Sequence, residues 1–475
     1  MLYITHSNEE GSMSSRPRTV DAAVELDSAS IDTFRSSLRG ELLRPGDADY
    51  DATRAVWNGM IDKRPALIAR CTGTADVIEA VNFAREHQML VSIRSGGHNV
   101  AGNAVCDDGL MIDLSPMKGI WVDPTQRTAR AQAGVLWGEF DRETQQFGLA
   151  TTGGVVSTTG VAGLTLGGGV GWLNGKYGLA IDNLLSVDIV TADGNLVTAS
   201  ASEHPDLFWG VRGAGANFGV VTSFEFRLHP VGPMILGGMV IHPFERAREV
   251  LHFYREFTAN EPDELTTYAA MLTGPDGNLV VALVICYAGP IDEGERVIAP
   301  LRLFGPPVAD MIGPMPYRSQ QSMFDEAFPH GRQSYWKSSL MHAIDDDAID
   351  IAIDYMSRVP SAGTATLFEH YHGAYARSEG GETAFSHRSD PYDFVILSVW
   401  DDRAETPANV RWTREFFETM RPHLSTGVYV NVLDNDEGVD RVKAAYGDNY
   451  ERLVALKHKY DPTNLFRMNQ NIRPG

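Results

Sequence analysis

The chain has 475 residues, of which 43% are hydrophobic and 21% charged, a composition that excludes a disordered or fibrous protein. Its formal net charge of −22 at pH 7 disfavours a nucleic-acid partner, whose phosphates would be repelled. No apolar run reaches the ~20 residues of a membrane helix, and the start lacks the basic-then-apolar order of a secretory signal. We therefore expect a cytoplasmic protein with neither a nucleic acid nor a membrane as partner.

The first 29 residues are polar, and we expect them to form a disordered extension. A β-α-β unit then opens the regular structure. Residues 65–71 form a short apolar strand, residues 74–87 have the apolar period of a helix that begins at Thr74 as its cap, and residues 90–93 form the next strand. A hairpin, a helix, a glycine-rich block, a second hairpin and a strand follow. They cover residues 119–134, 137–147, 153–178, 184–200 and 219–231.

Beyond residue 232, strands and helices are mixed in a way typical of an antiparallel sheet with helices on one face. The expected strands cover residues 235–244, 265–289 as a hairpin, 364–375 and 393–400. The expected helices cover residues 245–257, 292–303, 345–359 and 408–420. The tail from residue 426 is expected to hold a strand at 428–433 and a helix at 449–459.

Glycine is the compositional outlier, with 46 residues that gather in three turns at 94–102, 153–178 and 213–219. Glycine lets backbone N–H groups approach an anion closely, so three such turns could surround a long ligand that carries a pyrophosphate. The common nucleotide fingerprints do not fit these turns. Gly213-x-Gly215 lacks the third glycine at the required spacing and precedes a strand, and Gly175-Lys176 is followed by Tyr177 where a P-loop needs Ser or Thr.

Residues that bind metals are sparse in the sequence. The three cysteines, at positions 71, 106 and 286, have no metal-site spacing and are expected to be small buried hydrophobic residues. His370 and His372 offer two possible ligands on one strand face, but no third ligand is near in sequence. We therefore predict no metal site.

The glycine turns belong to four motifs that occur in a fixed order. These are RSGGHNVAG with the following IDLSPM, GLTLGGGVGWLNGKYGLAIDN, FWGVRGAGANFGVVTSFEFRLHP, and, in the tail, YDPTNLFRMNQNIRP. The chain thereby resembles the FAD-linked oxidases of the vanillyl-alcohol oxidase superfamily, and within them the berberine-bridge-enzyme-like group. The resemblance is strong over residues 62–231 and 425–475.

This resemblance implies an α+β protein with the two-domain PCMH-type FAD-binding fold and an antiparallel-sheet cap domain. The FAD-binding domain would cover residues 30–231, the substrate or cap domain residues 232–424, and the segment 425–475 would return to the FAD-binding domain.

The cofactor implied by the resemblance is FAD, bound covalently through His98, which stands where the family has its flavin-linked histidine. Many relatives carry a second link from a cysteine, and here that position is Val156, so we expect one covalent bond. The further residues that the resemblance places around FAD are Arg94, Ser95, Gly96, Gly97, Asn99, Gly102, Thr158, Thr159, Gly160, Gly163, Asp182, Gly219, Val220, Val221, Asn469 and Asn471. Thr159 also falls where relatives have a residue that gates oxygen.

The catalytic candidates come from the tail and the cap. Family members often show Y-x-N-Y before the final helix; here Tyr429 and Asn431 match, whereas Val432 replaces the second tyrosine. A tyrosine serves as a base only if its surroundings lower its pKa. Tyr371 and His372 are alternatives from the cap, but alternation along a strand places them on opposite faces, so both cannot line one site.

The function implied by the resemblance is that of an FAD-dependent oxidase. It would take hydride from a small alcohol, sugar or amine-bearing molecule and pass the electrons to O2, giving H2O2. The alternatives are a dehydrogenase with another acceptor, an oxidative-cyclisation enzyme of secondary metabolism, and a flavin-binding protein without turnover.

Overall fold

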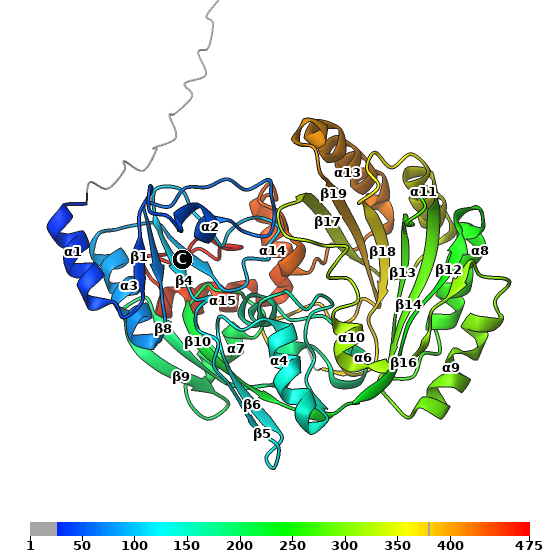
Figure 1. The fold of residues 1–475 in the computed structure, drawn as a ribbon, viewed down its shortest axis with the longest axis horizontal. Helices are drawn as coiled ribbons and strands as arrows, with labels where there is room; N and C mark the ends of the chain where they lie inside the picture. Colours follow the sequence, from blue (N-terminus) through cyan, green and yellow to red (C-terminus); the bar gives the residue numbers. More distant parts are fainter. Residues whose placement is uncertain (1–25, 379–380) are drawn as a thin grey trace, which may run out of the picture.

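The computed structural model describes residues 26–378 and 381–475 (Figure 1). Most of the predicted N-terminal extension, residues 1–25, lies outside the described residues. Helix α1 (Ser28–Ser37) begins before the predicted end of that extension, because the Asp27 carboxylate caps the helix by accepting a hydrogen bond from the Ser30 N–H at 2.8 Å.

The first region begins with the predicted β-α-β unit, built from β2 (Leu67–Arg70), α3 (Thr74–Glu86) and β3 (Val91–Arg94). Both strands run parallel to β4 (Leu110–Asp113), and β1 (Glu41–Leu43) adds an antiparallel edge, in the order β1-β2-β4-β3. Thr74 is the first helical residue and Gly73 holds the cap position. Asp76, in the first turn of this helix, accepts a hydrogen bond from the Thr72 N–H at 2.8 Å.

A second, antiparallel sheet of the first region has the order β5-β6-β10-β8-β9, and it contains both predicted hairpins. Its strands are β5 (Ile120–Asp123), β6 (Thr128–Gln132), β8 (Leu184–Thr191), β9 (Leu196–Ser200) and β10 (Gly219–Arg227). A short pair, β7 (Leu149–Ala150) and β11 (His229–Pro230), lies beside it. The helices of this region are α2 (Tyr50–Arg54), α4 (Trp137–Thr144), α5 (Val161–Leu166), α6 (Asn174–Tyr177) and α7 (Pro205–Val211).

The cap contains one eight-stranded antiparallel sheet whose order is β15-β12-β14-β13-β18-β19-β17, with β16 also paired to β12. Its strands are β12 (Met234–Pro243), β13 (Leu265–Thr273), β14 (Leu279–Tyr287), β15 (Ala309–Asp310), β16 (Gly313–Pro316), β17 (Gln333–Met341), β18 (Ala365–His370) and β19 (Tyr392–Trp400). Its helices are α8 (Ala247–Thr258), α9 (Ile291–Leu303), α10 (Tyr317–Gln321), α11 (Asp346–Ser357), α12 (Ala374–Arg377) and α13 (Thr406–Met420).

Helices α8, α9, α11 and α13 cover the sheet face that is turned away from the first region (Figure 1). The opposite face is turned toward the glycine-rich block. Strand β17 was not predicted. It pairs with β19 along its whole length, from Gln333 opposite Trp400 to Met341 opposite Tyr392, so this pairing and not a local sequence signal defines it.

The tail returns to the first region through α14 (Val439–Tyr446) and α15 (Tyr450–Tyr460), coloured orange-red in Figure 1. The predicted strand at 428–433 is wrong, because the segment forms a tight turn at Val430–Val432. The Val432 N–H closes this turn on the Tyr429 carbonyl at 3.1 Å. The tail thus lies across the glycine-rich block instead of joining a sheet.

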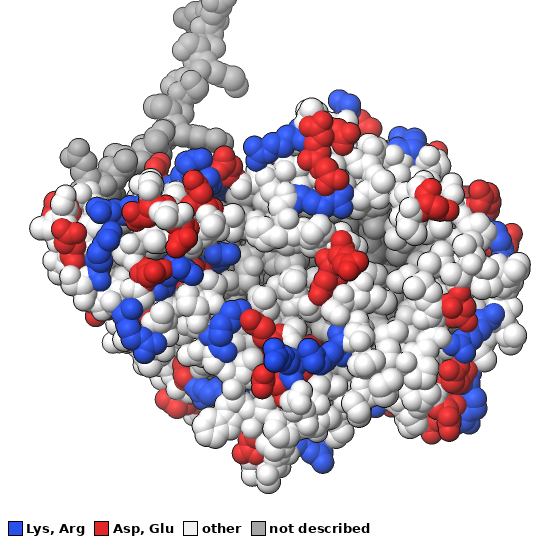
Figure 2. All heavy atoms as spheres, viewed as in Figure 1, with Lys and Arg blue, Asp and Glu red and all other residues white. Residues whose placement is uncertain are grey.

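The expectation for the cysteines agrees with the structure. All three cysteines are free and buried. Between residues 26 and 475, apart from 379–380, no helix has both the length and the hydropathy to cross a membrane. Figure 2 shows acidic and basic side chains interspersed on the visible face, with no continuous basic patch.

Asp141 on α4 is a buried carboxyl group without a partner. It is 1% exposed, and neither of its oxygens has a hydrogen-bond partner. Burial raises the pKa of Asp141 to about 8. Between the unfolded pKa of ~4 and this value, the folded protein holds a proton that the unfolded chain has lost. The free energy of unfolding therefore falls as the pH rises through this window, by roughly 4 kcal/mol at pH 7.

Asp141→Asn is accordingly expected to raise the melting temperature most at pH 7 to 8 and least near pH 5, since asparagine cannot ionise. Thermal melts of both proteins across this pH range measure the difference. Glu143→Gln, on the exposed side of the same helix, should melt like the wild type at every pH. A melting difference for Asp141→Asn that stays constant with pH would contradict the buried, protonated carboxyl.

Candidate active site

A cavity of about 340 Å³ lies where the three glycine-rich turns meet the cap sheet. Residues of all three turns line it, including Ser95–Asn99, Gly160 and Gly215. Strands β17, β18 and β19 of the cap and the tail segment 429–432 close the remaining sides. The sequence predicts that these turns could surround one ligand, and in the structure residues of all three line one cavity.

Most of the residues predicted to bind the cofactor line this cavity. These are Ser95, Gly96, Gly97, His98, Asn99, Val156, Thr159, Gly160, Gly163, Gly219, Val221 and Asn469. Those that do not are Arg94, Gly102, Thr158, Asp182, Val220 and Asn471.

The residues outside the cavity have identifiable reasons for being there. Val220 lies between Gly219 and Val221 on β10, so alternation points its side chain to the other face. Arg94 donates to the Thr53 carbonyl at 2.7 Å. Asp182 accepts from Arg388 at 2.7 Å and thereby connects the glycine-rich block to the cap. The remaining three residues also do not line the cavity. Thr158 is exposed and Gly102 packs on Ile61. Asn471 lies just beyond the lining residues of the tail.

The glycines of the cavity wall fit a ligand that carries phosphates. A Cβ atom on Gly96 would lie 2.6 Å from the Gly160 backbone nitrogen, so the first two turns touch only because both residues are glycine. Gly215 has a φ of +68° and open space where its Cβ would be. The described lining contains no Lys or Arg, so backbone N–H groups and neutral side chains such as Ser95, Asn99 and Thr159 are the donors available to an anion.

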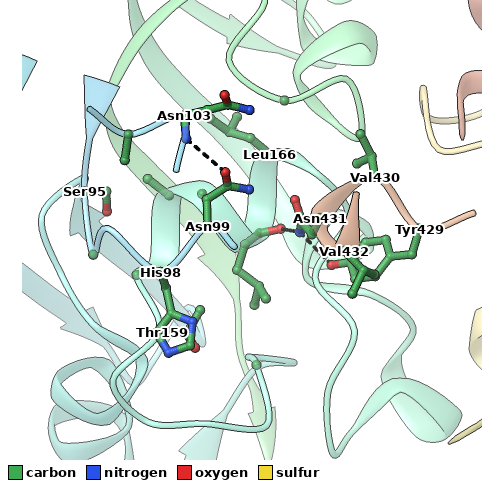
Figure 3. Close-up of a pocket in the computed structure, with 18 of the residues that line it drawn as sticks. Ser95, His98, Asn99, Asn103, Thr159, Leu166, Tyr429, Val430, Asn431 and Val432 are labelled. Carbon is green, nitrogen blue, oxygen red and sulfur yellow. Dashed lines mark hydrogen bonds between the residues drawn. The ribbon is translucent and has the colours of Figure 1, made fainter. Parts of the chain in front are cut away.

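His98 is suited to form a covalent bond inside this cavity. Its ring stacks on Trp57 with centroids 4.6 Å apart, and its Nε2 atom is buried without a hydrogen-bond partner. Burial lowers the pKa of His98 to about 4, so the imidazole is neutral and keeps a nitrogen lone pair at pH 7. Figure 3 shows His98 and Thr159 on one side of the space and Tyr429, Asn431 and Val432 on the other.

Tyr429 does not have the surroundings of a base. Its hydroxyl oxygen accepts from the Gly169 N–H at 2.9 Å. It also accepts from the Asn431 amide at 2.7 Å (Figure 3). Burial raises the pKa of Tyr429 to about 12, whereas a base requires a lowered value. Tyr429 and Asn431 both line the cavity, and they fasten the tail to the glycine-rich block.

The two cap candidates lie on opposite sides, as alternation predicted. Tyr371 lines the cavity, and its hydroxyl donates to Glu369 at 2.7 Å. Burial raises the pKa of Tyr371 well above its usual value. His372 does not line the cavity, and its Nε2 lies 2.8 Å from the Leu265 carbonyl on the other side of the strand. The prediction of His372 as a catalytic residue is therefore not supported by its position.

A pair of carboxyl groups in the cavity wall was missed by the sequence reasoning. Glu369 on β18 and Asp393 on β19 are direct cross-strand partners, and the Tyr371 hydroxyl lies between them, 2.7 Å from Glu369 and 3.4 Å from Asp393. Burial raises the pKa of Glu369 to about 7, and burial together with the neighbouring carboxylate raises that of Asp393 well above its usual value. Glu369 stands two positions before Tyr371, so the period of a strand could have identified it.

Comparisons with known proteins identify the family. Residues 65–200 match the family model of the FAD binding domain, and residues 428–473 match the model described as berberine and berberine like. The (R)-6-hydroxynicotine oxidase of Paenarthrobacter nicotinovorans is 34% identical over 453 residues, which cover 92% of this chain and 97% of that protein. An FAD-linked oxidoreductase of Dictyostelium discoideum is 33% identical over 449 residues, which cover 94% of this chain and 97% of its own.

A solved structure shows the same fold. The crystal structure of 6-hydroxy-D-nicotine oxidase from Arthrobacter nicotinovorans superimposes with a TM-score of 0.84 at 31% identity, over 92% of this chain and 99% of that chain. The predicted α+β PCMH-type FAD-binding fold with an antiparallel cap sheet is thereby confirmed. The chain belongs to the berberine-bridge-enzyme-like group of FAD-linked oxidases.

Proposed function

We propose that this protein is an FAD-dependent oxidase that acts on a small, cationic amine with an apolar body and uses O2 as its acceptor. The observation that carries this proposal is the carboxyl pair of Glu369 and Asp393, which faces the cavity that the glycine turns line. FAD, held covalently through His98 alone, supplies the acceptor for hydride and the route of electrons to oxygen. Per turnover, the amine loses two electrons and two protons to become an imine, and O2 gains both to become H2O2.

The charge of the cavity supports an amine in preference to a neutral sugar or alcohol. Burial raises the pKa of both carboxyl groups, so their ionised forms need a counter-ion in the cavity. No Lys or Arg of the described lining supplies one. Arg441, which is not part of the lining, donates to the Ser338 carbonyl at 2.6 Å, and its charge offsets only part of the effect of burial on the pKa of Asp393. A substrate ammonium group would fill this role.

The remaining walls support an apolar substrate body held in one orientation. Trp336, Val395 and Leu397 line the cap side of the cavity. Trp336 is the cross-strand partner of Leu397, so both point to the face that carries the carboxyl pair. An ammonium group on the carboxyl pair and an apolar body on these side chains would fix the substrate at two points, which directs one C–H bond toward the flavin.

Anaerobic bleaching of the flavin against matched amines, alcohols and sugars tests the proposal. We expect cationic amines with an aromatic or aliphatic body to bleach the flavin at least tenfold faster than their neutral alcohol analogues. Faster bleaching by alcohols or sugars would overturn the amine assignment. Reduced flavin that reoxidises only with an added acceptor would indicate the dehydrogenase, and a cyclised product would indicate the oxidative-cyclisation enzyme. No bleaching by any compound would indicate a flavin-binding protein without turnover.

A further inference from the structure

A second cluster of polar side chains lies on the opposite side of β18 from the cavity. His370 is the last residue of β18, His372 follows two positions later, and Glu261 belongs to the loop between α8 and β13. Glu369 and Tyr371 face the flavin cavity, so alternation turns both histidines away from it. Glu261 is the third candidate ligand that spacing along the sequence did not reveal, because it lies 109 residues before His370.

The three side chains converge on one carboxylate oxygen. Oε2 of Glu261 lies 2.6 Å from His370 Nδ1 and 3.4 Å from His372 Nε2. One ligand atom from each residue can be chosen so that all three lie within 4.8 Å of one another. With metal–ligand bonds of about 2.0–2.2 Å, ligand atoms in a tetrahedral site are about 3.3 Å apart, so small side-chain shifts suffice.

The surroundings orient the cluster and leave it accessible. The Thr267 hydroxyl donates to the other oxygen of Glu261 at 2.5 Å, which leaves Oε2 for the histidines. The Glu261 side chain is 0% exposed, and those of His370 and His372 are 7% and 13% exposed. The cluster lies in the wall of a groove of about 590 Å³ that is open to solvent, so an ion has a route in and water has room to bind it.

We propose that Glu261, His370 and His372 form a binding site for a divalent transition-metal ion of the Zn²⁺ type, with water as the fourth ligand. Two imidazole nitrogens and one carboxylate oxygen are a donor set that suits Zn²⁺ and not the oxygen-preferring Ca²⁺ or Mg²⁺. The metal replaces the proton through which His370 now contacts Glu261, and the His372 proton that now faces the Leu265 carbonyl moves from Nε2 to Nδ1 of the same ring.

Binding would connect three parts of the molecule. Glu261 lies in the loop that follows α8, and His370 ends β18. A Cβ atom on Gly175 of the glycine-rich block would lie 3.1 Å from the His372 ring, so the histidine also contacts the first region. The ion would therefore stabilise the junction between the cap and the glycine-rich block, beside the strand end that carries Glu369 and Tyr371.

The test is metal binding by the untagged, full-length flavoprotein after removal of metals with a chelator. Equilibrium dialysis against Zn²⁺, followed by metal analysis, is expected to show one tightly bound equivalent per chain and a raised melting temperature. His372→Gln and Glu261→Gln should each weaken binding by more than about tenfold. His458→Gln, an exposed histidine on α15, should bind like the wild type.

Failure of the wild type to bind an equivalent of Zn²⁺, or unchanged binding in both His372→Gln and Glu261→Gln, would overturn the site. Tight binding of Ca²⁺ or Mg²⁺ in place of Zn²⁺ would do the same. If the variants do not fold, the stoichiometry and melting shift of the wild type still decide the question. None of these measurements involves substrate oxidation, so their outcome does not depend on whether the proposed function is correct.

Discussion

His98→Ala is expected to release all of its flavin when the protein is precipitated with acid, whereas the wild type keeps its flavin in the pellet. The Nε2 atom of His98 is buried without a partner, and the ring is neutral because its pKa is about 4. Val156, at the position of the second link in relatives, has no atom that can bond to the flavin. No cysteine lines the described part of the cavity either. The proposed covalent bond therefore depends on one nitrogen atom.

Absorbance of the supernatant and the mass of the intact chain measure this prediction. The wild-type mass should exceed that of the polypeptide by one FAD, and the His98→Ala mass should equal the polypeptide alone. His330→Ala is a matched control, because this histidine is near His98 in space but exposed and outside the cavity lining. Flavin that stays attached in His98→Ala, or a flavin-bearing peptide that contains a cysteine, would show that the attachment is different.

Glu369→Gln and Asp393→Asn are each expected to lower kcat/KM for a cationic amine by about 100-fold or more. Removing one partner of a buried ion pair costs about 3 kcal/mol or more, which corresponds to this factor. Both replacements keep the size of the side chain and its place beside the Tyr371 hydroxyl, so folding and flavin attachment should be unchanged. The rate of anaerobic flavin reduction at varied amine concentration separates the loss of binding from the loss of rate.

Two comparisons make this second prediction specific. Glu415→Gln, an exposed carboxylate on α13, should leave the reduction rate unchanged. In Glu369→Gln, a neutral alcohol analogue of the amine should lose much less than the amine does, because it has no ammonium group to pair. If kcat/KM falls equally for amine and alcohol, or does not fall in either variant, the carboxyl pair does not recognise the substrate's ammonium group.

The glycine turns and the carboxyl pair illustrate what a sequence can and cannot reveal. Turn chemistry is local, so the three glycine-rich turns and the two hairpins of the first region were predicted correctly. The alternation of β18 also separated Tyr371 from His372. Asp393, in contrast, becomes part of the site only through the pairing of β19 with β18, and the sequence does not contain that register.

Burial and long-range contacts explain the other differences. The valine and tyrosine alternation at 428–433 looks like a strand, but the Tyr429 hydroxyl is held by Gly169 and the segment turns. The same burial raises the pKa of Tyr429, which a motif alone does not show. Asp182 was placed near the cofactor by its motif, yet its partner Arg388 comes from the cap, 206 residues later.

The closure of the cavity by the tail has a consequence for the timing of cofactor loading. Residues 429–432, Tyr446 and residues 468–470 line the space that the glycine turns open. A ribosome produces these residues after the glycine turns, so the first region has had time to begin folding. The cavity is thus complete only once the tail has packed on the first region. The proposed flavin attachment would therefore follow folding of the tail, and a chain truncated before residue 429 would keep every glycine turn and still lack this wall of the cavity.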